Sequence, residues 1–293
     1  MVRDTVRLPD GRALGVVGSG DPHGWPVFFF HGFAGSRLQR HPDDDLAAAA
    51  GVRLIAMDRP GIGQSDRLPG RRVIDWAADV AAVADALELD RFSVFGWSAG
   101  APHALACAYA MPRRVMAVAL ASSMGGWLIG PGANATHAGV ESRRLARLAG
   151  VTPWVLPGLL RVLTHRARHH PQRTVEKETR SLPASDQAVL AHPAIRAMII
   201  DTLGEAFRNG TAGVADDISA CARPWGFDPA CVNVTTYLWH GEADQTIPVA
   251  WAQDIAEQLP GCQPTWLPDA GHFLLFTHWL TILSALTPST PSG

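Results

Sequence analysis

The residue in this chain whose setting points most directly to covalent chemistry is Ser98. It lies in the pentapeptide Gly96-Trp-Ser-Ala-Gly100, between a short apolar run, Phe92–Phe95, and a run with apolar residues at helical spacing, Ala101–Ala110. A strand, a sharp turn and a helix in this order hold a serine in a strained conformation with its hydroxyl exposed, and the flanking glycines permit close packing. We therefore expect Ser98 to act as a nucleophile in acyl transfer.

A serine hydroxyl is a poor nucleophile until a base takes its proton, and His272 is the best placed of the twelve histidines. It follows the last predicted strand, Gln263–Leu267, within the sequence Asp269-Ala-Gly-His272. A loop at that position carries its side chain over the carboxyl edge of the sheet. We expect His272 to be the general base.

The acid that orients the histidine is expected after a strand between the serine and the histidine. Val234–Trp239 is such a strand, and Asp244 follows it, with Glu242 as a nearby second choice. The corresponding position after the preceding strand carries no carboxylate, and Asp269 is expected to cap a turn. Asp244 is therefore the predicted orienting acid.

Acyl transfer also needs donors for the oxyanion of the tetrahedral intermediate. The backbone N–H of Ala99, directly after the nucleophile and at the start of a helix, is one predicted donor. The second should come from the loop after the strand Pro26–Phe30, where His31-Gly32-Phe33 is found. We expect the N–H of Phe33 to fill this role.

The rest of the chain supplies elements that would position these residues. Up to Gly126 and again from about residue 218, strands and helices alternate, which indicates an α/β core. Residues 127–217 show no such alternation and are expected to form several short helices. The predicted organisation is a core of residues 1–126 and 218–293 interrupted by a helical cap, residues 127–217. The predicted strands are Thr5–Leu8, Arg12–Val17, Pro26–Phe30, Val52–Met57, Phe92–Phe95, Val115–Ala121, Val234–Trp239 and Gln263–Leu267.

Five segments, taken together and in this order, resemble the capped serine hydrolases of the α/β-hydrolase superfamily, in particular its esterase-like branch. The resemblance implies a mostly parallel, eight-stranded sheet flanked by helices, with a helical cap inserted after the sixth strand. The segments are His31-Gly-Phe-Ala-Gly-Ser36, Asp58-Arg-Pro-Gly-Ile-Gly-Gln-Ser-Asp66, Gly96-Trp-Ser-Ala-Gly100, His240-Gly-Glu-Ala-Asp-Gln-Thr-Ile-Pro248 and Asp269-Ala-Gly-His272.

The identity of the nucleophile narrows the reaction. Haloalkane dehalogenases and epoxide hydrolases of this fold carry aspartate where this chain has Ser98, so cleavage of a carboxylic ester or thioester is favoured. Gly100 is followed by Ala101, which weakens but leaves open a carbon–carbon bond hydrolase. Two further alternatives remain, namely cofactor-free haloperoxidase-like activity and a slow-turnover receptor or binding protein.

Apolar side chains beside the predicted catalytic residues are candidates for the substrate pocket. Trp97, Ile247 and Phe273 adjoin catalytic positions in the sequence, and Trp127 opens the predicted cap. The cap is expected to set specificity because it covers the open end of the sheet.

Composition excludes several classes of function. A formal net charge of −2 gives no electrostatic case for binding nucleic acid, and no apolar run reaches the ~18 residues of a membrane span. The beginning of the chain does not resemble a signal peptide, and the four cysteines show no ligand-like spacing. We expect a cytoplasmic protein with a small ester-like substrate, no metal and no cofactor, and the sequence leaves a homodimer open.

Overall fold

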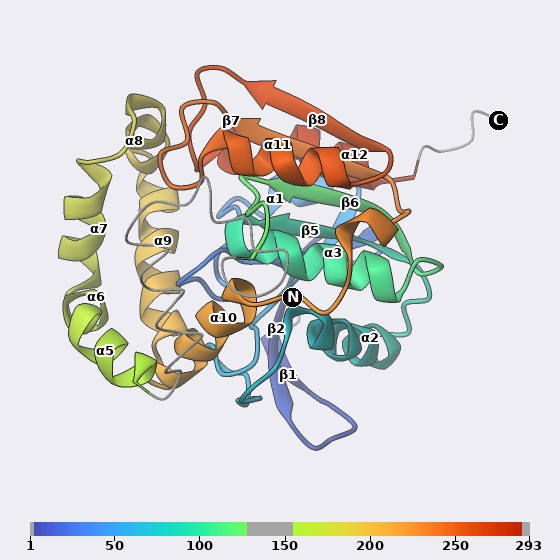
Figure 1. Ribbon diagram of the computed structural model, residues 1–293, viewed down its shortest axis with the longest axis horizontal. Helices are drawn as coiled ribbons and strands as arrows, with labels where there is room; N and C mark the ends of the chain where they lie inside the picture. The colour runs from blue at the N-terminus through green and yellow to red at the C-terminus, as the bar shows by residue number, and fades with distance from the viewer. Residues whose placement is uncertain (1–2, 128–154, 289–293) are drawn as a thin grey trace.

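A computed structural model of the protein describes residues 3–127 and 155–288. Eight strands form one sheet in the order β1-β2-β4-β3-β5-β6-β7-β8 (Figure 1). β1 and β2 run antiparallel to their neighbours, and all other neighbouring strands are parallel. The fold predicted from the sequence is therefore confirmed. The strands are β1 (Arg3–Arg7), β2 (Ala13–Gly20), β3 (Trp25–Phe30), β4 (Val52–Met57), β5 (Phe92–Trp97), β6 (Val115–Ala121), β7 (Thr236–Gly241) and β8 (Cys262–Leu267).

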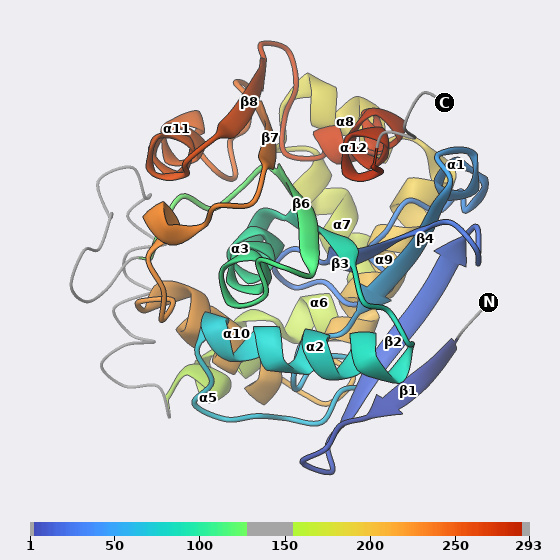
Figure 2. The same ribbon diagram turned by 90° about the vertical axis from the view of Figure 1, so that its right-hand side faces the viewer.

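The central strands are apolar on both faces because helices cover both sides of the sheet. In β3, Phe28 and Phe30 belong to one hydrophobic cluster, and Phe29 belongs to the cluster on the opposite face. Helices α2, α3 and α11 pack on the first face and α1 and α12 on the second, as Figure 2 shows. These helices are α1 (Asp45–Ala49), α2 (Trp76–Ala86), α3 (Ala101–Ala110), α11 (Val249–Gln258) and α12 (Trp279–Leu286).

The end of the core contains two separate helical pieces. A 3-10 turn, Leu274–Phe276, precedes α12, and the N–H groups of Thr277 and His278 both donate to the carbonyl of Leu274. Apolar periodicity does not separate these turns from a continuous helix over so few residues.

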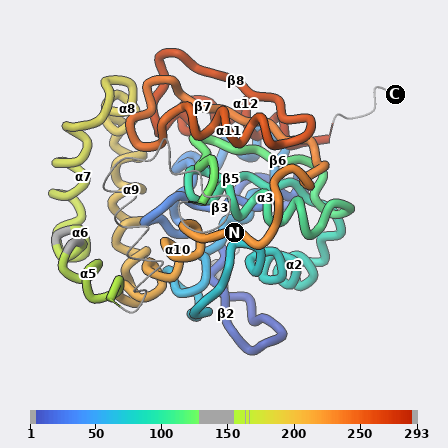
Figure 3. Tube along the Cα trace, in the orientation of Figure 1, coloured from blue at the N-terminus to red at the C-terminus, as the bar shows by residue number. Residues whose placement is uncertain are grey.

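Between β6 and β7, residues 156–222 form a helical segment, traced in Figure 3. Figure 1 shows helices α5 to α9 gathered beside the end of the sheet toward which the arrow of β8 points. Its helices are α5 (Leu156–Leu163), α6 (His165–His169), α7 (Pro171–Thr179), α8 (Ala184–Leu190), α9 (Pro193–Ala206) and α10 (Ala212–Ala222). Part of the predicted cap, residues 128–154, lies outside the described residues, and its predicted end at residue 217 falls within α10.

No helix among the described residues is long and apolar enough to cross a membrane.

Candidate active site

Ser98 follows β5 directly and begins the 3-10 turn that leads into α3. Its φ is +55°, which is unusual for a residue with a side chain and stores strain at this turn. A Cβ at Gly100 would overlap the carbonyl of Phe30, and one at Gly96 would lie 2.5 Å from the carbonyl oxygen of Gly100. The two glycines of the pentapeptide are therefore required by the close approach of strand, turn and helix.

His272 and Asp244 meet across the loops that follow β8 and β7. The Nδ1 atom of His272 lies 2.8 Å from Oδ2 of Asp244, and the Asp244 carboxylate is fully buried. The N–H groups of Thr246 and Ile247 donate to the other oxygen of Asp244, each at 2.8 Å. Burial by itself raises the pKa of Asp244, but the charge and hydrogen bond of His272 outweigh burial and lower it. Asp244 is thus held as a carboxylate against one nitrogen of the imidazole.

Ser98 and His272 line one cavity of about 270 Å³. The core contributes its floor, including Phe33, Trp97 and Phe273, so three of the predicted pocket and oxyanion residues are found there. Helices α7 to α9 and the connection between α7 and α8 contribute mainly apolar side chains, namely Val175, Leu182, Leu190, Ile199 and Leu203. Polar groups of Gln39, Glu178, Thr179, Thr202 and Thr246 complete the lining by described residues.

The loop that carries Phe33 runs directly against the nucleophile. A Cβ at Gly32 would lie 3.3 Å from Cβ of Ser98, and the N–H of Gly32 donates to Oε1 of Gln39 at 2.7 Å. Phe33 itself is 45% exposed, and Ala99 is buried immediately after Ser98. The backbone around both predicted oxyanion donors is therefore near Ser98.

Two predicted pocket residues lie elsewhere. Trp127 packs on Trp225, with ring centroids 5.6 Å apart, at the edge of the hydrophobic cluster on the α3 face of the sheet. Ile247 contributes backbone, since its N–H donates to Asp244 and its carbonyl lies 2.9 Å from Nε2 of His240. Neither is among the described residues that line the cavity with Ser98. The contacts of Ile247 with Asp244 and His240 are therefore made by its backbone.

The backbone of His272 is held from both sides. Its carbonyl accepts hydrogen bonds from Nε1 of Trp97 at 3.1 Å and from Oγ of Ser122 at 3.0 Å. Its N–H donates at 2.9 Å to Oδ2 of Asp186, which lies on α8 in the helical segment. No sequence motif marks Asp186, because its partners are 86 residues or more away in the chain.

Arg59 is fully buried and joins three elements. It forms a two-point ion pair with Asp217 of α10, at 2.8 and 2.7 Å, and donates to the carbonyl of His31 at 2.5 Å. Arg71 also donates to Asp217, at 2.9 Å. Burial raises the pKa of Asp217, but the charges of both arginines outweigh it and keep this pKa far below the ordinary range. The pair fixes the loop that precedes Phe33.

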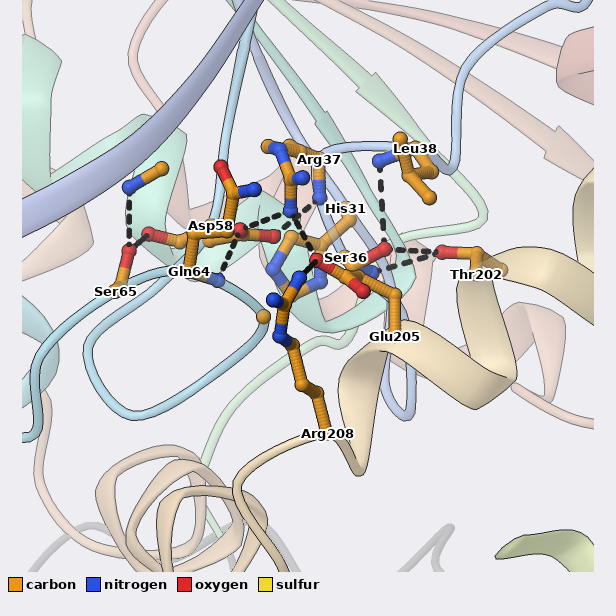
Figure 4. A network of polar contacts seen from close by, with 12 residues as sticks. His31, Ser36, Arg37, Leu38, Asp58, Gln64, Ser65, Thr202, Glu205 and Arg208 are labelled. Carbon is orange, nitrogen blue, oxygen red and sulfur yellow. Dashed lines mark hydrogen bonds and ion pairs between the residues drawn. The ribbon is translucent and has the colours of Figure 1, made fainter. Parts of the chain in front are cut away.

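A second network ties the same loop to α9 (Figure 4). Asp58 accepts the N–H of Arg37 at 2.6 Å and its guanidinium at 2.7 Å, and the same guanidinium pairs with Glu205 at 2.6 Å. The N–H of Ser36 donates to Oγ1 of Thr202 at 2.9 Å. Figure 4 shows Glu205 and Thr202 reaching from α9 toward the loop after β3. The helical segment is therefore bonded to the loops of the site as well as packed over them.

Among the described residues, no group of three or more histidine, cysteine, aspartate or glutamate side chains could hold a metal ion.

Comparison with known proteins identifies relatives of several activities. The family described as alpha/beta hydrolase fold matches residues 26–278. The chain is 33% identical over 120 residues to a proline iminopeptidase from Xylella fastidiosa strain 9a5c, covering 39% of this chain and 37% of that protein. It is 35% identical over 122 residues to a non-heme chloroperoxidase from Streptomyces lividans, covering 41% of this chain and 44% of that protein. The chain thus spans less than half the length of these curated relatives in the matched regions.

A solved structure covers nearly the whole chain. A thermophilic esterase from Thermogutta terrifontis is 22% identical and aligns with a TM-score of 0.69, covering 97% of this chain and 96% of that chain. At this identity the likeness concerns the fold.

Proposed function

The chain belongs to the alpha/beta hydrolase fold family, and on that premise we propose that it is a serine hydrolase that cleaves a carboxylic ester or thioester. One observation carries the proposal: strained Ser98 and the His272–Asp244 pair converge on one cavity lined mainly by apolar side chains. Strain at a positive φ and a buried carboxylate–imidazole pair are costly features that cluster at reactive sites.

The proposed mechanism assigns each group one role. Since Nδ1 of His272 is directed at Asp244, its Nε2 is the nitrogen available to take the proton of Ser98. Ser98 Oγ attacks the carbonyl carbon, and the proton passes from His272 to the leaving alcohol or thiol as the acyl-enzyme forms. Water then attacks the acyl-enzyme, with His272 again as base, and releases the acid.

The oxyanion of each tetrahedral intermediate is proposed to bind the N–H groups of Ala99 and Phe33. Gln39 already accepts the N–H of Gly32, so the N–H of Phe33 is the next donor in a loop that touches Ser98. Donors fixed before the reaction stabilise developing charge without reorganisation. All these groups come from the chain itself, so the proposed reaction requires no cofactor.

The helical segment is proposed to act as a cap that selects the substrate. Its contribution to the cavity is mainly aliphatic, which suits an apolar acyl or alkyl group more than a charged one. We propose residues 127–217 as this cap, with α10 as its junction to the core because Asp217 binds Arg59.

The test combines covalent labelling with turnover. Purified protein is treated with a fluorophosphonate probe, and the labelled residue is located by peptide mass. In parallel, hydrolysis of p-nitrophenyl esters of increasing acyl length and of one acyl thioester is assayed. We expect labelling of Ser98 and hydrolysis, both abolished in Ser98→Ala. If the wild-type protein is not labelled and cleaves no substrate faster than Ser98→Ala, the proposal is wrong.

The same assay separates the alternatives. Labelling without turnover would favour a slow-turnover binding protein. Peroxide-dependent halogenation of a phenolic dye, or cleavage of a vinylogous diketone in preference to every ester, would assign the same three residues to haloperoxidase-like or carbon–carbon hydrolase chemistry.

A further inference from the structure

We propose that Asp186, on helix α8 of the helical segment, is a positioning residue for the general base and holds the loop of His272 in its reactive place. The inference rests on the proposed function of His272. Asp186 lies outside the sequence motifs of the site, and it links the helical segment over the cavity to the residue proposed as general base.

The geometry of the contact is bidentate. Oδ2 of Asp186 accepts the N–H of His272 and Oδ1 accepts the N–H of Phe273, both at 2.9 Å. One carboxylate thus accepts two consecutive backbone N–H groups of the loop that follows β8. Hydrogen bonds to an ionised acceptor are stronger than those between neutral groups, so two of them fix both position and orientation.

The loop leaves room for this carboxylate at Gly271. A Cβ at position 271 would overlap Cγ and both carboxylate oxygens of Asp186. Asp186 itself is only 1% exposed. The absent side chain of Gly271 and the buried carboxylate of Asp186 are complementary parts of one contact.

Asp186 completes a set of restraints on one residue. The carbonyl of His272 is held by Trp97 and Ser122, and its ring by Asp244. Without Asp186, the N–H of His272 would lose this hydrogen-bond acceptor, while its carbonyl and its ring would remain bound. The imidazole would then vary in its distance to Ser98, and errors of about 1 Å in such positions can lower rates by about a hundredfold.

Charges around Asp186 come from several elements. Burial, and secondarily the charge of Asp244, raise its pKa, and the hydrogen bonds of Phe273 and His272 and the charge of His272 oppose them. Asp269 and His278 line a groove of about 330 Å³ together with Asp186. A carboxylate placed at such cost in a loop–helix contact indicates a function beyond packing.

Helix α8 connects this contact to the substrate cavity. Leu190 at its end and Leu182 just before it both line the cavity that contains Ser98. The position of α8 therefore determines both the shape of the cavity and the restraint on His272. A substrate that seats against these leucines would favour the same position of α8 that restrains the base.

The first test is steady-state kinetics of Asp186→Asn on a p-nitrophenyl ester. The amide can accept one of the two N–H groups, while its NH₂ opposes the other. We expect kcat to fall by roughly ten- to a hundredfold, with KM changed by less than about threefold, since the cavity is intact. Ser185→Ala, at the neighbouring position of α8, is the matched control and should retain wild-type kcat.

A second variant reaches the contact from the other side. Gly271→Ala leaves the carboxylate ionised but displaces it, and should also lower kcat. If both variants act through one contact, the double variant should lose no more than the more impaired single variant. Multiplied effects would mean that the two residues act separately and would contradict the proposal.

Amide hydrogen exchange supplies a readout that does not depend on activity. In Asp186→Asn, the amides of His272 and Phe273 should exchange at least about tenfold faster than in the wild-type protein, with global unfolding unchanged. Unchanged protection, or a rise in KM with constant kcat, would overturn the inference and leave Asp186 as a packing residue. If the wild-type protein is neither labelled nor active, the proposed function fails, while the exchange experiment still decides whether Asp186 restrains the loop.

Discussion

The ends of the central strands and the helical segment between β6 and β7 contribute to the site in different ways. The strand ends carry Ser98, Asp244 and His272, each within a recognisable sequence motif. The helical segment carries no such motif, yet four of its side chains, Asp186, Asp217, Thr202 and Glu205, contact the loops of the site. These contacts are to His272, Arg59, Ser36 and Arg37.

On the proposed mechanism, this difference separates residues that react from residues that restrain. A reacting group needs a particular backbone position, which a motif encodes locally. A restraining group needs only to arrive at the right place from any element, so it leaves no local pattern. Four predictions test how far the two regions can be separated, beginning with the reacting residues.

The largest effect is expected for Asp244→Asn. To keep Nδ1 of His272 as a hydrogen-bond donor, the new amide would have to turn its NH₂ group away from the ring. The imidazole is therefore no longer held in the tautomer that accepts the proton of Ser98. We expect kcat for ester hydrolysis to fall by roughly 10³- to 10⁴-fold with little change in the melting temperature. Asp269→Asn, in the exposed turn before His272, is the control and should stay within about twofold of wild type; the reverse order would reassign the acid.

The next largest effect is expected on the free energy of unfolding, when the buried ion pairs that join α10 to the core are broken. Asp217→Asn removes the charge that compensates Arg59 and Arg71, two arginines with 0% and 3% exposed side chains. Breaking a buried pair leaves an uncompensated charge, so the free energy of unfolding should fall by about 3–5 kcal/mol in urea denaturation. A loss below about 1 kcal/mol would mean that α10 is not coupled to the core through this pair.

An intermediate effect on the free energy of unfolding is expected when the pH is lowered. Burial, and then the charge of Arg59, lower the pKa of His103 from 6.5 to about 3, and the same causes lower that of His31. In this pH range the two histidines therefore bind protons in the unfolded chain but not in the folded one. The free energy of unfolding falls as pH drops below about 6.5 and continues to fall toward pH 3. Between pH 7 and pH 5 the loss from His103 alone should be roughly 2 kcal/mol. Urea melts of His103→Gln should show a shallower dependence on pH over this range, and an equal slope would contradict the assignment.

The smallest effect is expected one residue from Asp217. Asp216 pairs with Arg67, whose side chain is 44% exposed, at 2.6 Å. An exposed pair is screened by water and salt, so Arg67→Met should change the free energy of unfolding by less than about 1 kcal/mol. Together with Asp217→Asn, this variant compares a buried and an exposed ion pair on one helix, and equal losses would show that burial does not decide their contribution.

The strands and the family were predictable because their signals are local. All eight predicted strands overlap observed ones, since apolar runs such as Val27–Phe30 must be buried on both faces of a parallel sheet. The close approach at Gly96 and Gly100 was likewise implied by their spacing around Ser98. The five-residue helix α1 was not predicted, because so short an alanine-rich segment has no clear period.

The placement of pocket residues was less predictable. Trp97 and Phe273 line the cavity that contains Ser98, whereas Trp127 packs on Trp225 and Ile247 contacts Asp244 through its backbone. Neighbours in sequence share a backbone position, whereas the direction of each side chain depends on what packs against it.

The sequence by itself determined the parallel sheet, the turn at Ser98 and the order of serine, acid and histidine, because each depends on residues within a few positions of one another. Only the tertiary structure decided which groups hold these residues. Asp186 reaches His272 across 86 residues and Asp217 reaches Arg59 across 158. A carboxylate that binds a backbone N–H or a buried guanidinium can come from any helix that passes within reach, so its role is set by packing and not by its neighbours in the chain.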